Sequence, residues 1–265
     1  MGFSGQFEWN CAFVCNGGVS MIGVVGSGVM GAQISAYLLG FEYTIIVKIG
    51  DYSRCDVILE KIKKLYSKNN PDKEFPQHLI EFTDKFESLV SCSIILESSK
   101  EDVSYKKTIL NNISKYCSED TLVASNTSSI SIVELANSYK YPSNVIGCHF
   151  FNPIFKMDLV EVIITHYASS ETINKIIEFT KTIKKVPIIV KDSPGFVVNR
   201  LLLPQINDAI RLVESGVASM EDIDSAIKLG LHHPMGPFAL ADYIGLDVCY
   251  NILYEICHNT NNLYY

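Results

Sequence analysis

The chain lacks any apolar run that approaches the roughly 20 residues a helix needs to cross a bilayer, so we expect no membrane span. Residues 1–18 contain neither lysine nor arginine, which argues against a secretory or mitochondrial leader and predicts a cytoplasmic protein. No Cys-x-x-Cys or Cys/His spacing suits zinc, so we expect reduced thiols and no metal. The dispersed cysteines are Cys11, Cys15, Cys55, Cys92, Cys117, Cys148, Cys249 and Cys257.

Positive charge is also scarce. The net charge is −7 over 265 residues, and most lysines are scattered. A nucleic-acid partner therefore has little electrostatic support. One helical cluster indicates a solvated helix face more readily than a patch for coenzyme phosphates; it comprises Lys61, Lys63, Lys64 and Lys68.

Short apolar segments alternate with amphipathic ones up to about residue 190, and only helical patterns follow. This alternation predicts an α/β fold with a parallel, doubly wound sheet. The expected strands are Val19–Val25, Tyr43–Val47, Ser93–Leu96 and Thr121–Ala124. The expected helices of the second part are Phe196–Glu214, Met220–Leu229 ended by Gly230, and one after Pro237.

A glycine motif lies between the first strand and an apolar helix. In it, Gly26 permits a tight turn, Gly28 lets backbone approach a pyrophosphate, and Gly31 lets helix and strand pack closely. Val29 and Met30 complete the first helical turn, whose amides would face the phosphates. The strand-turn-helix setting favours a dinucleotide site over a structural turn.

This motif makes the α/β part a Rossmann-type domain. We expect it over residues 19–191, after an N-terminal extension of residues 1–18. The turn at residues 191–195 would separate it from a smaller all-α domain over residues 192–265.

The second strand lacks the acidic residue that would bind the ribose hydroxyls of NAD. Ile49 stands in that place, with Lys48 before it and Asp51 two residues beyond. Three interpretations stay open: Asp51 reaches back, NAD binding is weakened, or Lys48 favours the 2′-phosphate of NADP.

A separate segment encodes an acid/base pair. His149 closes an apolar strand that begins at Asn144, and Glu161 lies inside the next strand, Leu159–Ile164. The two side chains can meet across the bend. A proton acceptor encoded together with a dinucleotide site points to a dehydrogenase.

With these motifs, the chain from about Val19 onward resembles the L-3-hydroxyacyl-CoA dehydrogenase family, particularly its 3-hydroxybutyryl-CoA members. Several blocks in the family's order carry the resemblance. They are Gly26 to Gly31, Ala124 to Ser129, Gly147 to Pro153, Leu159 to Glu161, Pro194 to Arg200 and His233 to Phe238.

The resemblance implies that His149 takes the proton of the 3-hydroxyl while hydride passes to the nicotinamide. Glu161 would orient the imidazole and stabilise its protonated form. Ser128 and Asn199 match positions that hold the substrate oxygens, and Asn152 would help to place nicotinamide or substrate. Taken alone, Ser128 could equally cap backbone amides, and Asn199 could be a polar residue on a first helical turn.

The resemblance also implies that Glu101 and Lys106 line the cofactor and substrate cleft. An acyl-CoA thioester substrate, a homodimer and a role in fatty-acid β-oxidation would follow, with a mitochondrial location for some members. The family continues beyond the helix at Tyr250–Cys257, so we expect a C-terminal truncation. With Ile49, this keeps open a catalytically impaired relative with a binding or structural role. An enzyme acting on a free hydroxy acid is a further alternative.

Overall fold

The computed structural model describes residues 21–260, which are built on an eight-stranded sheet. The strand order is β3-β2-β1-β4-β5-β6-β7-β8. Neighbouring strands are parallel except β6 and β7, which are antiparallel. The strands are β1 (Met21–Val25), β2 (Thr44–Lys48), β3 (Ile80–Thr83), β4 (Ile94–Glu97), β5 (Leu122–Ser125), β6 (Val145–Phe150), β7 (Leu159–Ile164) and β8 (Val186–Lys191).

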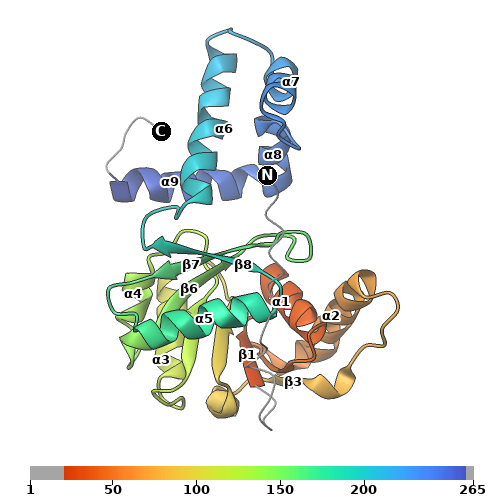
Figure 1. Cartoon of the computed structure of the whole chain (residues 1–265), viewed down its shortest axis with the longest axis vertical. Helices are drawn as coiled ribbons and strands as arrows, with labels where there is room; N and C mark the ends of the chain where they lie inside the picture. The colour runs from red at the N-terminus through yellow and green to blue at the C-terminus, as the bar shows by residue number, and fades with distance from the viewer. Residues whose placement is uncertain (1–20, 261–265) are drawn as a thin grey trace, which may run out of the picture.

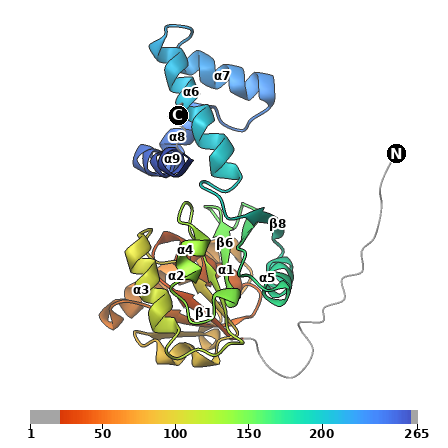
Figure 2. The ribbon, with the colours of Figure 1, turned by 90° about the vertical axis from the view of Figure 1, so that its left-hand side faces the viewer.

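Five α-helices cover the two faces of this sheet (Figures 1 and 2). They are α1 (Val29–Leu39), α2 (Cys55–Asn69), α3 (Val103–Ile113), α4 (Ile132–Ala136) and α5 (Ser170–Thr182). Successive strand residues point to opposite faces, so Val24 packs with α1, α2 and α5 while Val25 packs with α3 and α4. Short 3₁₀ turns are η1 (Tyr52–Arg54), η2 (Gln77–Leu79), η3 (Glu87–Ser91) and η4 (Pro142–Asn144).

Four helices form a second layer with its own small core (Figure 1). They are α6 (Val198–Glu214), α7 (Met220–Leu231), α8 (Pro237–Ile244) and α9 (Leu246–Thr260). Buried side chains of α6, α8 and α9 meet there, among them Leu203, Ala241 and Ile256. The expected α/β fold followed by an all-helical part is confirmed.

Two details of the expectation are corrected. The sheet is not wholly parallel, because the eight residues 151–158 between β6 and β7 are too few for a crossover helix. Gly230 does not end its helix, because α7 continues to Leu231 and His232 terminates it with a left-handed φ of 55°.

Some expectations fall on residues that the structure does not describe. The extension of residues 1–18 and the start of the first strand at Val19 lie outside residues 21–260. Within that range, no helix combines the length and apolarity that a membrane crossing requires. The same residues contain no cluster of three His, Cys, Asp or Glu side chains suited to a metal ion.

Candidate active site

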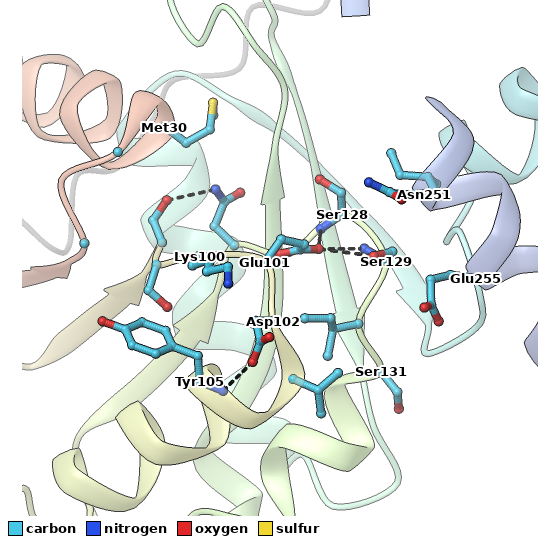
Figure 3. A pocket seen from close by; sticks show the side chains of 18 of the residues that line it. Met30, Lys100, Glu101, Asp102, Tyr105, Ser128, Ser129, Ser131, Asn251 and Glu255 are labelled. Atoms are coloured by element: carbon cyan, nitrogen blue, oxygen red, sulfur yellow. Dashed lines mark hydrogen bonds between the residues drawn. The ribbon is translucent and has the colours of Figure 1, made fainter. Parts of the chain in front are cut away.

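A large cleft opens where the parallel strands end, between the sheet and helix α9 (Figure 3). The carboxyl edge of a parallel sheet is where such folds bind ligands. Loops after β1, β4 and β5 line one side, and α9 contributes Asn251 and Glu255 from the other. The cleft is therefore shared by the two layers.

The glycine turn after β1 forms one end of this cleft. A Cβ on Gly26 would lie 2.4 Å from the Ser98 carbonyl oxygen, and one on Gly31 would lie 2.1 Å from the Gly26 carbonyl oxygen. Gly26 also has a φ of 108°. By contrast, a Cβ on Gly28 would meet nothing within 4 Å. Gly26 and Gly31 close the turn tightly, whereas Gly28 leaves open space.

That open space lies at the start of α1. Gly28 is its N-cap residue and forms no side-chain cap hydrogen bond, and the first turn has no acidic residue. Val29 is 60% exposed, and Val29 and Met30 both line the cleft. A helix N-terminus presented in this way suits an anionic diphosphate. The residues present therefore fit a dinucleotide.

The expected ribose position after β2 holds no carboxylate directed into the cleft. Ile49 is 1% exposed, and its amide donates to the Thr83 carbonyl at 2.8 Å. The Asp51 carboxylate instead accepts from the amide and hydroxyl of Ser53 at 3.0 and 2.7 Å, capping η1. Ile49 is thus a core residue, and the Asp51 carboxylate caps the 3₁₀ turn that follows it.

Lys48 does not reach the cleft either. Its Nζ lies 4.2 Å from the centre of the Phe86 ring, and burial, the largest influence, lowers its pKa. The residues after β2 that do line the cleft are Gly50 and Arg54. Sequence reasoning missed Arg54, because its place depends on the turn at η1.

His149 and Glu161 are direct partners across β6 and β7. His149 Nδ1 and Glu161 Oε2 are 2.8 Å apart, and the two residues are 5% and 1% exposed. The rings of Phe151 and Phe196 lie 4.5 and 5.8 Å from the imidazole. Because a carboxylate only accepts, Nδ1 carries the proton and Nε2 is left as the basic nitrogen.

The second oxygen of Glu161 ties this pair to the helical layer. Oε1 accepts from the amides of Val197 and Val198, each at 3.0 Å, where α6 begins. Burial alone would raise the pKa of Glu161. The hydrogen bonds from His149, Val198 and Val197 nevertheless hold this pKa below its ordinary value. The carboxylate is therefore kept ionised beside the imidazole.

Ser128 and Asn199 also lie together. The Asn199 amide Nδ2 donates to the Ser128 carbonyl oxygen at 3.2 Å across 71 residues of sequence. Asn199 follows Val198, whose amide binds Glu161, so these predicted residues converge on the start of α6. Ser128 lines the cleft, whereas His149 and Asn199 lie deeper.

Glu101 is at the centre of the cleft floor (Figure 3). Its Oε1 accepts from the Thr127 hydroxyl at 2.6 Å and from the amides of Ser128 and Ser129 at 2.8 and 3.2 Å. The carboxylate thereby orders the loop that carries Ser128.

Lys106 is not on the cleft surface, which corrects the expectation that it lines the cleft. Its side chain is completely buried and lies 2.9 Å from Glu97 Oε2 and 3.7 Å from Glu101 Oε2. Ser125 donates to the same Glu97 oxygen at 2.6 Å. Lys106 supports the floor from beneath.

Asn152 is connected to the dinucleotide helix by a residue that the sequence did not single out. Gln33, on α1, donates to Asn152 Oδ1 at 2.9 Å and accepts from the Ile154 amide at 3.0 Å. Asn126, also missed, accepts from the Phe150 amide at 2.9 Å and lines the cleft. Only its place in the Ala124 to Ser129 block could have pointed to it.

Comparisons with known proteins agree with this arrangement. The 3-hydroxyacyl-CoA dehydrogenase NAD binding domain matches residues 21–193, and the C-terminal domain of the same family matches residues 195–264. A 3-hydroxybutyryl-CoA dehydrogenase of Clostridioides difficile is 43% identical over 243 residues, covering 88% of this chain and 86% of that protein.

The human mitochondrial hydroxyacyl-coenzyme A dehydrogenase is 38% identical over 246 residues, covering 86% of this chain and 77% of its own length. Among solved structures, (S)-3-hydroxybutyryl-CoA dehydrogenase from Ralstonia eutropha superposes with a TM-score of 0.87 at 34% identity. That match covers 92% of this chain and 89% of the other. The chain belongs to the 3-hydroxyacyl-CoA dehydrogenase family.

Proposed function

We propose that this protein interconverts 3-hydroxyacyl-CoA and 3-ketoacyl-CoA by hydride transfer with a nicotinamide cofactor. The observation that carries the proposal is the buried His149–Glu161 pair beside a cleft that begins at a dinucleotide-type glycine turn. The names of the relatives supply the substrate class.

In this proposal, His149 acts at the 3-hydroxyl. Its Nδ1 is held by Glu161 at 2.8 Å, so Nε2 takes the proton during oxidation and returns it during reduction. The buried carboxylate stabilises the imidazolium that forms. When bound, the cofactor accepts or supplies the hydride.

Ser128 and Asn199 would position the substrate oxygens. The Ser128 hydroxyl and the second Asn199 N–H are donors suited to a carbonyl that gains negative charge. The Asn199–Ser128 hydrogen bond of 3.2 Å sets the distance between these donors. The acyl-CoA thioester would enter the cleft between sheet and α9.

Cofactor contacts are proposed for the glycine turn and the cleft floor. Gly26 and Gly31 shape the turn, whereas Gly28, Val29 and Met30 would lie against the diphosphate. Beyond the turn, the proposed contacts are Glu101 and Asn152, with Lys106 supporting Glu101 from below. Ile49 supplies no carboxylate to bind the ribose hydroxyls of NAD, so other residues at this corner would determine the preference between NAD and NADP.

We also propose a homodimer formed through the helical layer. Apolar side chains are conspicuously exposed there, with Leu201 at 71%, Leu229 at 79% and Tyr250 at 67%. Such patches favour association. Sedimentation should give twice the chain mass, and a monodisperse monomer would refute the dimer.

A reducing compartment, the cytosol, is our proposal for location. Five cysteines within residues 21–260 are free thiols, and the proposal rests on them; they are Cys55, Cys92, Cys117, Cys148 and Cys249. Recovery of the tagged protein in a cytosolic fraction would support it, and recovery in an organelle fraction would contradict it.

The activity test is oxidation of reduced cofactor by purified protein with acetoacetyl-CoA. Acetoacetate, which lacks the thioester, is the matched control. Turnover with the thioester alone supports the proposal. Turnover with the free acid at equal rate would favour the hydroxy-acid alternative, and none in a folded sample would favour an impaired relative.

A further inference from the structure

The corner of the cleft after β2 has an unusual set of side chains. In the expected arrangement, a carboxylate at the strand end binds the two ribose hydroxyls of NAD. Here Ile49 fills that position, is 1% exposed and has no polar atom in its side chain. The two residues of this turn that line the cleft are Gly50 and Arg54.

The nearest carboxylate is a poor substitute. Asp51 does not line the cleft, and its Oδ1 accepts both the amide and the hydroxyl of Ser53. Turning this oxygen toward a ribose would break the cap of η1. A dinucleotide bound in the cleft would therefore lack a carboxylate partner at this corner.

Arg54, in contrast, is available for an anion. It is exposed, and within residues 21–260 its side chain forms no ion pair at 4.0 Å or less. A guanidinium binds phosphate oxygens through two parallel N–H groups, which makes arginine a specific phosphate ligand. Lys48 is excluded from this role because its Nζ lies over the Phe86 ring.

A second cation lies near the same part of the cleft. Lys61 Nζ donates to the Gly28 carbonyl oxygen at 3.2 Å, so α2 brings a positive charge to the glycine turn. The carboxylates that line the cleft belong to the loops after β4 and β8 and to helices α4 and α9; they are Glu101, Asp102, Glu134, Asp192 and Glu255. The lining contributed by the turn after β2 therefore has a cation and no carboxylate, and Asp51, outside the lining, is near enough to Arg54 for the two charges to interact.

We propose that Arg54 binds the 2′-phosphate of a nicotinamide dinucleotide phosphate, so that this chain prefers NADP(H) to NAD(H). The inference rests on the proposed dinucleotide cleft and adds a specificity-determining residue to it. It differs from the cofactor named in the family description of the first domain.

Binding titrations test this without relying on turnover. NADPH and NADH would be titrated by calorimetry, with adenosine 2′,5′-bisphosphate and adenosine 5′-monophosphate as half-cofactor probes. We expect the 2′-phosphorylated member of each pair to bind about tenfold or more tightly, since a charged hydrogen-bonded contact is at stake. Arg54→Gln should remove that advantage and leave NADH binding unchanged.

Two further variants complete the design. Lys48→Gln is the matched loss of a cation at the same strand end, and it should leave both affinities unchanged because Lys48 faces Phe86. Gly50→Asp places a carboxylate in the cleft lining, where a Cβ meets nothing within 4 Å. It should weaken NADPH binding and strengthen NADH binding.

The outcomes separate this inference from the proposed function. Equal or tighter binding of NADH, or an Arg54→Gln variant that keeps the NADPH preference, would overturn the role of Arg54 while leaving the dehydrogenase proposal standing. Failure of the folded protein to bind either dinucleotide or either half-cofactor would overturn the cofactor cleft itself.

Discussion

The proton-transfer pair and the ribose corner are constructed in opposite ways. Glu161 is 1% exposed and uses both oxygens, one for His149 and one for the amides that begin α6. Arg54 is exposed, and it belongs to a short turn after β2. The proposed chemistry depends on contacts between distant segments, whereas the proposed cofactor preference depends on one turn that can vary without disturbing the core.

The largest effect is expected from Glu161→Gln, which alters the buried His149–Glu161 pair. Glutamine keeps the size and can still accept from Val197 and Val198, but it has no charge to hold the Nδ1–H tautomer of His149. We expect kcat to fall by about 10²- to 10⁴-fold. Steady-state kinetics with acetoacetyl-CoA would measure this.

The control for that variant is dinucleotide affinity by calorimetry, which should match wild type because Glu161 does not line the cleft. A kcat within about threefold of wild type would remove Glu161 from the mechanism, since orders of magnitude are expected from a pair of this kind.

Lys106→Met tests what the buried Lys106–Glu97 ion pair contributes to the free energy of unfolding. The substitution removes the cationic partner of the buried Glu97 carboxyl group and leaves Ser125 and Ser99 as its remaining donors. We expect the free energy of unfolding to fall by about 3–5 kcal/mol, measured by denaturant titration. The double variant Lys106→Met with Glu97→Gln should recover part of that loss, and a single variant as stable as wild type would contradict the account.

Acid should weaken the link between the layers through Glu161. Its pKa is below the ordinary carboxyl value in the folded protein, so the stability it contributes is complete above the unfolded-state pKa. That contribution is lost as pH falls through the folded-state pKa. Thermal unfolding across this acidic range should show a smaller loss of stability in Glu161→Gln than in wild type, and parallel curves would contradict the link.

The smallest effect is expected from Lys63→Gln, which removes an exposed ion pair and serves as the contrast to the buried pair of Lys106. Lys63 pairs with Glu60 at 3.1 Å on the surface of α2. We expect a change in unfolding free energy of about 0.5 kcal/mol or less, by the same denaturant titration. A loss as large as that of Lys106→Met would contradict the interpretation of this lysine cluster as a solvated helix face.

Sequence patterns predicted the parts of the site whose residues lie close together in the sequence. The glycine turn follows a strand and opens a helix, so its role could be inferred directly. His149 and Glu161 were foreseeable because a short connection forces β6 and β7 side by side.

The unpredicted parts depend on tertiary packing. Lys106 has a long polar side chain that would ordinarily be exposed, and only the fold shows Glu97 beneath it. The α9 side chains reach the cleft through the packing of the two layers, which no local pattern encodes. The same holds for Gln33, whose partner Asn152 is 119 residues away.

The most direct test of the proposed proton transfer is a single turnover of acetoacetyl-CoA by protein preloaded with its preferred reduced cofactor. His149→Gln would be compared with wild type after equal binding of both ligands is shown. Loss of the group that donates the proton in this direction should slow cofactor oxidation by about 10²-fold or more. Equal rates in the two proteins would contradict the assignment of His149 as the group that transfers the proton.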